Sequence, residues 1–171
     1  MFFLARQSVG WIDHRRREPI LRLIQPKIAL TFNSLNGEKG EIMKVYNLTA
    51  HPISIIAEAD CHSSPAIRKL VADANVKPVM VIPSYGMVSA KTETHEAEPI
   101  EGIPVFEKKI TGIDPLPEES PDNIYIVSAM YVSAYRALYP NSNIPLYTVA
   151  DLVYTEDGRT ILGSRGIMLA L

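Results

Sequence analysis

From residue 43 onward, short apolar runs alternate with clusters of turn-forming residues, a pattern that predicts strands. The strongest run covers residues 123–127, where Ile, Tyr, Ile and Val follow one another. Such β-branched and aromatic side chains pack well on a sheet surface. Weaker runs predict further strands over residues 43–47, 53–57, 78–82, 87–94, 103–106 and 109–112. The last part of the chain predicts a hairpin, with strands over residues 150–154 and 160–163 and a turn at Glu156-Asp157-Gly158.

Two segments carry the signals of helices. Ser64 and Pro65 suit the cap and the first position of one helix. Helical spacing and an Asn stop follow at Ile67, Leu70, Val71, Ala74 and Asn75. A second helix is predicted to begin at Ser128 and to end at Pro140, with one apolar side formed by Met130, Ala134, Ala137 and Leu138. Together the segments predict a single α+β domain, a mostly antiparallel sheet with two helices.

The chain divides at Met43. Residues 1–42 have a net charge of +3 and contain the only Trp, whereas residues 43–171 have a net charge of −5. Lys39-Gly40-Glu41 can also be encoded by a purine run that resembles a bacterial ribosome-binding sequence just before Met43. We therefore hypothesise that Met43 is the natural start and that residues 1–42 are translated leader. The alternative is a native N-terminal arm, and the intact mass of the native protein distinguishes the two.

Composition excludes several classes of protein. One cysteine, Cys61, allows no intrachain disulfide, which argues against a disulfide-stapled secreted scaffold and favours a reducing cytosol. The overall charge of −2 argues against a nucleic-acid-binding protein. No apolar run is long enough to span a bilayer, so no membrane association is expected.

Several short motifs, in matching order, resemble those of a group of short bacterial and phage proteins that open on Asn-Leu-Thr-Pro-His-Pro. The first is Asn47-Leu-Thr-Ala-His-Pro-Ile53, which departs from the group by having Ala50 in place of proline. The later ones are Ile82-Pro-Ser-Tyr-Gly86, Gly102-Ile-Pro-Val105, Tyr125-Ile-Val-Ser-Ala129, Asp151-Leu-Val153 and Asp157-Gly-Arg159 with Gly163. The chain is also similar, more distantly, to phage sponge proteins that sequester nucleotide-derived signals of bacterial immunity.

The second resemblance implies a binding protein without catalysis or cofactor, whose partner is a small phosphate-bearing nucleotide. Two alternatives stay open. One is a small nucleotide-processing enzyme that uses His51 as acid or base. The other is a module that blocks a host protein through the acidic loop of residues 114–122.

The candidate ligand-binding residues each have a simpler structural interpretation. Ser128, at a strand-to-helix junction, suits phosphate binding but also capping. His51, with Asn47 and Thr49, suits either a ligand contact or a turn network. Arg136 and Arg165 could clamp a phosphate or lie on the surface. Tyr125 could stack on a base or pack in the core, as could Tyr131 and Tyr135.

Other candidates are weaker. Asp60-Cys61-His62 contains a nucleophile and a base, but neighbours in a chain rarely face each other. The scattered histidines and single cysteine lack the spacing of zinc ligands, so no metal site is expected. Glu96, Glu98, Glu101, Glu118 and Glu119 are interpreted as solvated loop residues.

Assembly is the last expectation. Ile161-Leu162 reads as a strand edge with little charge protection, and residues 167–171 are apolar to the end. Such surfaces favour a homo-oligomer, with a two-fold dimer as the default. We expect a chain beginning at Met43 to be at least a dimer, and deletion of residues 167–171 to break it or to leave it insoluble.

Overall fold

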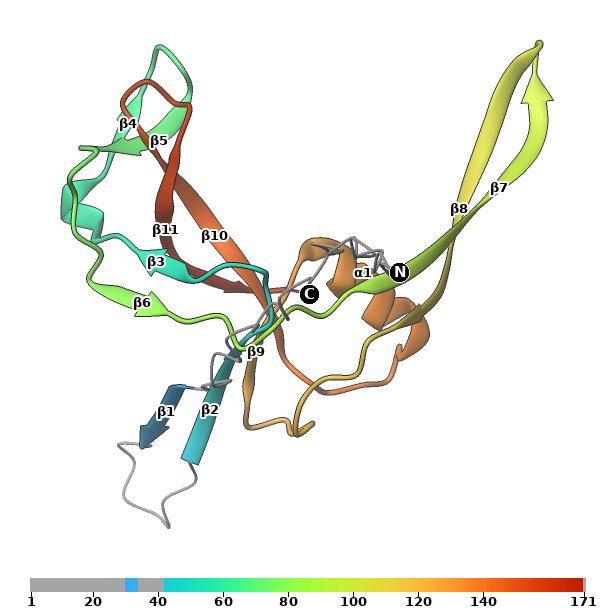
Figure 1. Cartoon of the computed structure of the whole chain (residues 1–171), viewed down its shortest axis with the longest axis horizontal. Coiled ribbons are helices and arrows are strands. Elements are labelled where there is room, and N and C mark those ends of the chain that lie inside the picture. The colour runs from blue at the N-terminus through green and yellow to red at the C-terminus, as the bar shows by residue number, and fades with distance from the viewer. Residues whose placement is uncertain (1–29, 34–41, 171) are drawn as a thin grey trace, which may run out of the picture.

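The fold is built mainly of strands (Figure 1). The computed structural model describes residues 30–33 and 42–170, and about half of them lie in strands. Within these residues a single helix exceeds seven residues, and the main sheet forms a nearly closed barrel. The predicted α+β class with two helices is therefore wrong. The reason lies at residues 64–75, where strands replace the first predicted helix.

The described elements follow one another along the chain in a simple order. They are β1 (Leu30–Asn33), β2 (Ile42–Asn47), β3 (Ile53–Ile55), the 3-10 helix η1 (Glu58–Asp60), β4 (His62–Ser64), β5 (Lys69–Ala72), β6 (Met80–Ile82), β7 (Ala90–Ile100), β8 (Ile103–Ile113), β9 (Ile124–Ile126), α1 (Ala129–Leu138), β10 (Leu146–Thr155) and β11 (Ile161–Leu169).

Strands far apart in the sequence lie side by side in the main sheet. Its order is β1-β2-β9-β10-β11-β3-β6, and β5 joins β10 with β4 beyond it. Among the described strands, four of its pairings are parallel and four antiparallel, so the sheet is mixed rather than mostly antiparallel. After β6 the chain returns to β2, where Ser84 bridges Asn47 and the Tyr85 N–H donates to the Asn47 carbonyl at 2.8 Å. This contact brings the chain that follows β6, at one end of the sheet, beside β2, the strand next to the other end.

Strand β9 carries apolar side chains on both faces of the barrel wall. In β9, Ile126 points into the barrel with Val45 and Ile82, whereas Tyr125 points outward and packs under α1. Residues that alternate in a strand face opposite sides of the sheet, so a strand covered on both sides must be apolar throughout. This explains why residues 123–127 give the strongest strand pattern in the sequence.

The first predicted helix is absent, because residues 62–72 form a hairpin instead. β4 and β5 pair antiparallel, and the turn between them is closed by the Arg68 N–H donating to the Ser64 carbonyl at 2.8 Å. Val71 is fully buried because β5 also lies beside β10. The apolar spacing that suggests a helix is here divided between a turn and a short strand.

The second predicted helix is confirmed as α1. Its cap is Ser128, whose hydroxyl accepts from the Tyr131 N–H at 3.2 Å. The predicted apolar side is correct only for Ala134, because Met130, Ala137 and Leu138 are exposed. The buried side chains are those of Tyr131, Val132, Ala134 and Tyr135. The tyrosines cover the outer face of the barrel, so the helix is rotated relative to the prediction.

Strands β7 and β8 form a two-stranded arm that extends away from the barrel (Figure 1). Its turn is Glu101-Gly102, both with positive φ, as a two-residue hairpin turn requires. Each strand has 11 residues, which corresponds to roughly 35 Å of extended chain. Glu96 and Glu98, interpreted from the sequence as loop residues, lie in β7.

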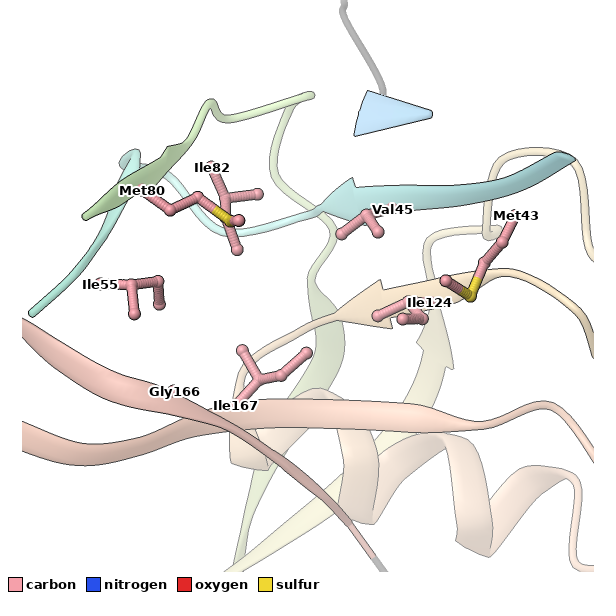
Figure 2. Close-up of a pocket in the computed structure, with 8 residues that line it drawn as sticks. All are labelled: Met43, Val45, Ile55, Met80, Ile82, Ile124, Gly166 and Ile167. Atoms are coloured by element: carbon pink, nitrogen blue, oxygen red, sulfur yellow. The ribbon is translucent and has the colours of Figure 1, made fainter. Parts of the chain in front are cut away.

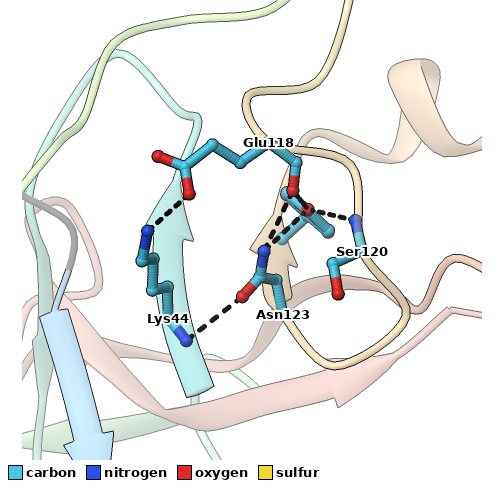
Figure 3. A network of polar contacts seen from close by, with 5 residues as sticks. Lys44, Glu118, Ser120 and Asn123 are labelled. Atoms are coloured by element: carbon cyan, nitrogen blue, oxygen red, sulfur yellow. Dashed lines mark hydrogen bonds and ion pairs between the residues drawn. The ribbon is translucent and has the colours of Figure 1, made fainter. Parts of the chain in front are cut away.

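The acidic segment of residues 114–122, which precedes β9, is held against the barrel by hydrogen bonds and an ion pair (Figure 3). The Tyr125 hydroxyl donates to the Glu118 carbonyl at 2.7 Å and accepts from the Ser120 N–H at 3.0 Å. The Asn123 side chain accepts from the Lys44 N–H at 3.3 Å, and the Lys44 ammonium pairs with the Glu118 carboxylate. These contacts fix residues 118–123 against β2 and β9.

Two expectations concern the ends of the sequence. β1 lies within residues 1–42 and pairs with β2, while residues 1–29 and 34–41 lie outside the described residues. The start at Met43 stays a hypothesis. The other expectation is a strand edge at Ile161-Leu162. In the structure β11 lies between β10 and β3. Its pairing with β3 is at Ser164, however, and the Ile161 side chain is 53% exposed.

Candidate functional site

A cleft rich in cationic side chains opens where the β4–β5 hairpin meets β10 and β11. We call it the basic cleft. Its volume is about 500 Å³, and it is lined by Ser63, Arg68, Lys69, Leu70, Asp151, Leu152, Tyr154 and Arg165. Three of these side chains are cations and one is a carboxylate, so the cleft favours an anionic ligand.

The β4–β5 turn places the first two cations. Arg68 has a φ of 54°, a left-handed conformation that ends the turn and starts β5. Lys69 follows, with its ammonium 4.0 Å from the centre of the Tyr154 ring and donating to the Gly158 carbonyl at 2.9 Å. This cation–π contact and hydrogen bond fix the Lys69 charge at the edge of the cleft.

The third cation comes from the facing pair of strands. Arg165 in β11 pairs with the Glu58 carboxylate at 2.7 Å, which orients its guanidinium. Asp151 in β10 has a φ of 47°, the second non-glycine residue of the cleft with a left-handed backbone. Backbone strain of this kind gathers at functional sites in proteins. A smaller cavity of about 260 Å³ shares Asp151 and Arg165 and continues toward Gly166 and Ile167.

Arg68 is the cation most available to a ligand. It is exposed, and within the described residues its guanidinium has no hydrogen bond or ion pair. A free guanidinium binds a phosphate or carboxylate through two parallel hydrogen bonds. Lys69 and Arg165 would add charge, and Leu70 and Leu152 supply apolar surface for the rest of the ligand.

The predicted group Asn47, Thr49 and His51 is a turn network. The Asn47 amide donates to the carbonyls of His51 (2.9 Å) and Ile82 (3.1 Å), and its oxygen accepts from the Thr49 N–H and hydroxyl. Asn47 is 1% exposed, so it has no surface left for a ligand. Its contacts are those of the simpler interpretation. Thr49 and His51 also line a cavity of about 400 Å³ with Ile53, Leu152 and Ile161.

The other predicted residues lie elsewhere. Tyr125 is fully buried, and its hydroxyl donates to the Glu118 carbonyl in the network of Figure 3. Ser128 is exposed and caps α1. Arg136 donates to the carbonyls of Ser142 (3.1 Å) and Ile144 (3.2 Å), which fixes the loop after the helix.

The predicted residues therefore do not share one cavity. Thr49 and His51 line one, Arg165 lines the basic cleft, and Tyr125, Ser128 and Arg136 line neither. Arg68, Lys69, Asp151 and Tyr154 were not predicted. Their sequence signal was hidden because Ser64-Pro65 reads as the start of a helix, whereas it begins a hairpin turn.

A fourth cavity, of about 280 Å³, lies between strands of the main sheet (Figure 2). Its side chains converge from β2, β3, β6, β9 and β11, and all are apolar: Met43, Val45, Ile55, Met80, Ile82, Ile124 and Ile167, with Gly166. Because no polar side chain lines it, the cavity offers nothing to orient a phosphate.

Within the described residues, no hydrogen bond joins the Cys61 thiol to a general base. The Cys61 thiol donates to the Ala57 carbonyl at 3.3 Å, and His62 lies 3.4 Å from the Glu156 carboxylate. Burial raises the pKa of the Cys61 thiol, which lowers the fraction of reactive thiolate. Within residues 30–33 and 42–170, no three His, Cys, Asp or Glu side chains lie close enough to hold a metal ion. None of the helices there has the length and apolar character needed to cross a bilayer.

The acidic segment 114–122 is held to the body at both ends. The Asp114 carboxylate accepts from the Ser89 N–H at 3.0 Å, and the Asp114 carbonyl accepts from the Tyr131 hydroxyl at 2.7 Å. Its role in blocking a host protein stays a prediction.

Comparison with known protein families, curated proteins and solved structures finds no match for this chain.

Proposed function

We propose that the chain is a non-catalytic binding protein that captures a small phosphate-bearing nucleotide, as a phage-type sponge for an immune signal in the host cytosol. The observation that carries the proposal is the basic cleft, where Arg68, Lys69 and Arg165 surround one open space. The ligand's phosphate contacts Arg68 and Arg165, and its apolar or ring portion lies on Leu152. Capture in place of catalysis is favoured because, among the described residues of this cleft, no hydrogen bond joins the Ser63 hydroxyl to Lys69 or Asp151.

The test is a thermal-shift screen with cyclic nucleotides and ADP-ribose derivatives. A ligand at 100 times its Kd stabilises the folded state by about 2.7 kcal/mol, which raises the Tm by several degrees. The ligand is then recovered after denaturation and its mass is measured. An intact ligand supports capture, whereas no Tm shift with any compound at millimolar concentration contradicts the proposal.

Two arginine variants locate the site. Arg68→Ala is expected to weaken binding by about tenfold or more, because it removes a charge-assisted contact to phosphate. Arg159→Ala is the matched control, since Arg159 is also an exposed arginine but does not line the cleft. Equal affinity of the two variants would place the ligand outside the basic cleft.

The enzyme alternative gives a different result in the same screen. A chemically changed ligand after incubation indicates turnover, and His51→Ala then abolishes that turnover while leaving binding. An intact ligand with both the original chain and His51→Ala rejects it.

A further inference from the structure

The β7–β8 arm has an edge with no partner. In the part of the chain that the structure describes, β8 pairs with β7 and with no other strand. The arm is also exposed on both faces toward its tip, where Ile100, Ile103 and Phe106 are 65%, 66% and 65% exposed. A two-stranded hairpin alone is marginally stable in water, and a free edge with apolar side chains is usually covered.

We infer that β8 pairs antiparallel with β8 of a second copy of this chain, with Lys108 facing Lys108 of the second copy across the two-fold axis. The inference is independent of the proposed function. Its basis is that β8 complements its own reversed sequence. With Lys108 at the centre, Glu107 faces Lys109 of the second copy, and Phe106 faces Ile110 of the second copy. Opposite charges and apolar pairs in facing positions stabilise a sheet.

Symmetry restricts the alternatives. Facing residues of antiparallel strands point to the same side of the sheet, so a two-fold axis between identical strands must run midway between a residue and its own copy. An axis at Glu107 would place the two Glu107 carboxylates together and Val105 against Lys109. An axis at Lys109 would place Lys108 against Ile110. Of these three central registers, the one at Lys108 is the only one that pairs Glu107 with Lys109 and Phe106 with Ile110, and its one unfavourable contact is between the two Lys108 side chains.

Strand β7, which pairs with β8 within each arm, adds to the charge complementarity of the proposed dimer. Within one arm, Glu93 faces Lys109 and His95 faces Glu107. Pairing of two arms therefore places Glu93, Lys109, the second copy's Glu107 and its His95 in one row, with charges of alternating sign where His95 is protonated. Phe106 and Ile110 occupy the opposite face, where two Phe106–Ile110 pairs lie on either side of the central Lys108 pair. A β-bulge near Thr92 limits the pairing to about residues 106–110.

Two adjacent lysines give a matched test, because each variant removes one exposed charge per chain. Lys109→Thr loses a facing Glu107 on both sides of the axis, so dimer affinity should fall about tenfold. Lys108→Thr removes a like-charge contact and creates a Thr–Thr pair, so affinity should rise. The assay is light scattering during size exclusion over a concentration series. Equal effects of the two variants would overturn the register.

A mixing experiment tests the pairing itself. Lys109→Glu alone places Glu against Glu, and Glu107→Lys alone places Lys against Lys, so each variant should be mostly monomeric. Mixed in equal amounts, they restore both opposite-charge pairs, so a dimer should reappear. Changes within each arm are the same in the separate and mixed samples. A monomeric original chain at 100 micromolar, or no dimer in the mixture, would reject the inference, whatever the ligand screen shows.

Discussion

Gly163 is the position where the main sheet has least room for a side chain. A Cβ at this residue would lie 2.3 Å from the Ser54 carbonyl oxygen and 3.1 Å from its carbon, both backbone atoms of β3. Backbone cannot rotate away as a side chain can. β3 and β11 would therefore have to separate at the point where the Ile56 N–H donates to the Ser164 carbonyl at 2.8 Å.

Gly163→Ala is expected to destabilise the fold by about 2–4 kcal/mol. Overpacking at a rigid contact costs typically 1–3 kcal/mol, and loss of the adjacent hydrogen bond adds about 1 kcal/mol. The matched control is Gly166→Ala in the same strand, because a Cβ there meets nothing within 4 Å. We expect Gly166→Ala to be neutral or slightly stabilising, since alanine reduces the freedom of the unfolded chain.

Denaturation by urea measures both variants. The midpoint should fall for Gly163→Ala with an unchanged m value, and the Tm should fall by roughly 4–16 °C. If the two alanine variants differ by less than about 0.5 kcal/mol, the close approach of β3 and β11 is not as described.

Three further predictions follow from named contacts. Asn47→Ala should cost about 2 kcal/mol or more in urea denaturation, because it leaves the buried Ile82 carbonyl without its donor; a loss below 0.5 kcal/mol would contradict the turn network. Tyr125→Phe should cost about 1–2 kcal/mol, since the Glu118 carbonyl and Ser120 N–H lose their shared hydroxyl, and Tyr147→Phe, a partly buried tyrosine of β10 with no side-chain hydrogen bond among the described residues, is the control. Cys61 should react with a thiol reagent more slowly than free cysteine at pH 8, because its raised pKa leaves less thiolate, and Arg165→Ala should slow it further, because the positive charge of Arg165 lowers that pKa; a rate equal to that of free cysteine would refute this.

Sequence reasoning works best where one strand or helix carries its own signal. β9 and α1 were predicted because a continuous apolar run and a Ser cap followed by a Pro stop are local features. The C-terminal hairpin was predicted from its Asp-Gly turn, although β10 and β11 are longer than expected. Each of these elements is specified by residues within a few positions of one another.

The misinterpreted elements depend on distant partners. β5 is a strand because β10, more than 70 residues later, pairs with it, and nothing in residues 64–75 reveals that pairing. The arm was read as separate fragments because neither of its faces is buried, so its polar and apolar residues do not alternate regularly. The basic cleft was missed for the same reason, since Arg68 and Lys69 meet Tyr154 and Arg165 only through the β5–β10 contact.

The strand order also determines when this protein can fold. Three strands at the centre of the sheet, β9, β10 and β11, come from the last third of the described chain, and β2 and β3 each depend on one of them. During synthesis β2 therefore lacks its central partner until β9 has left the ribosome, and β3 lacks its partner until β11 has followed. Closure of long loops makes such pairing slow, and unpaired strands are prone to aggregate meanwhile. Completion of the main sheet must thus wait until β11 is made, and β3 depends on protection from aggregation until then.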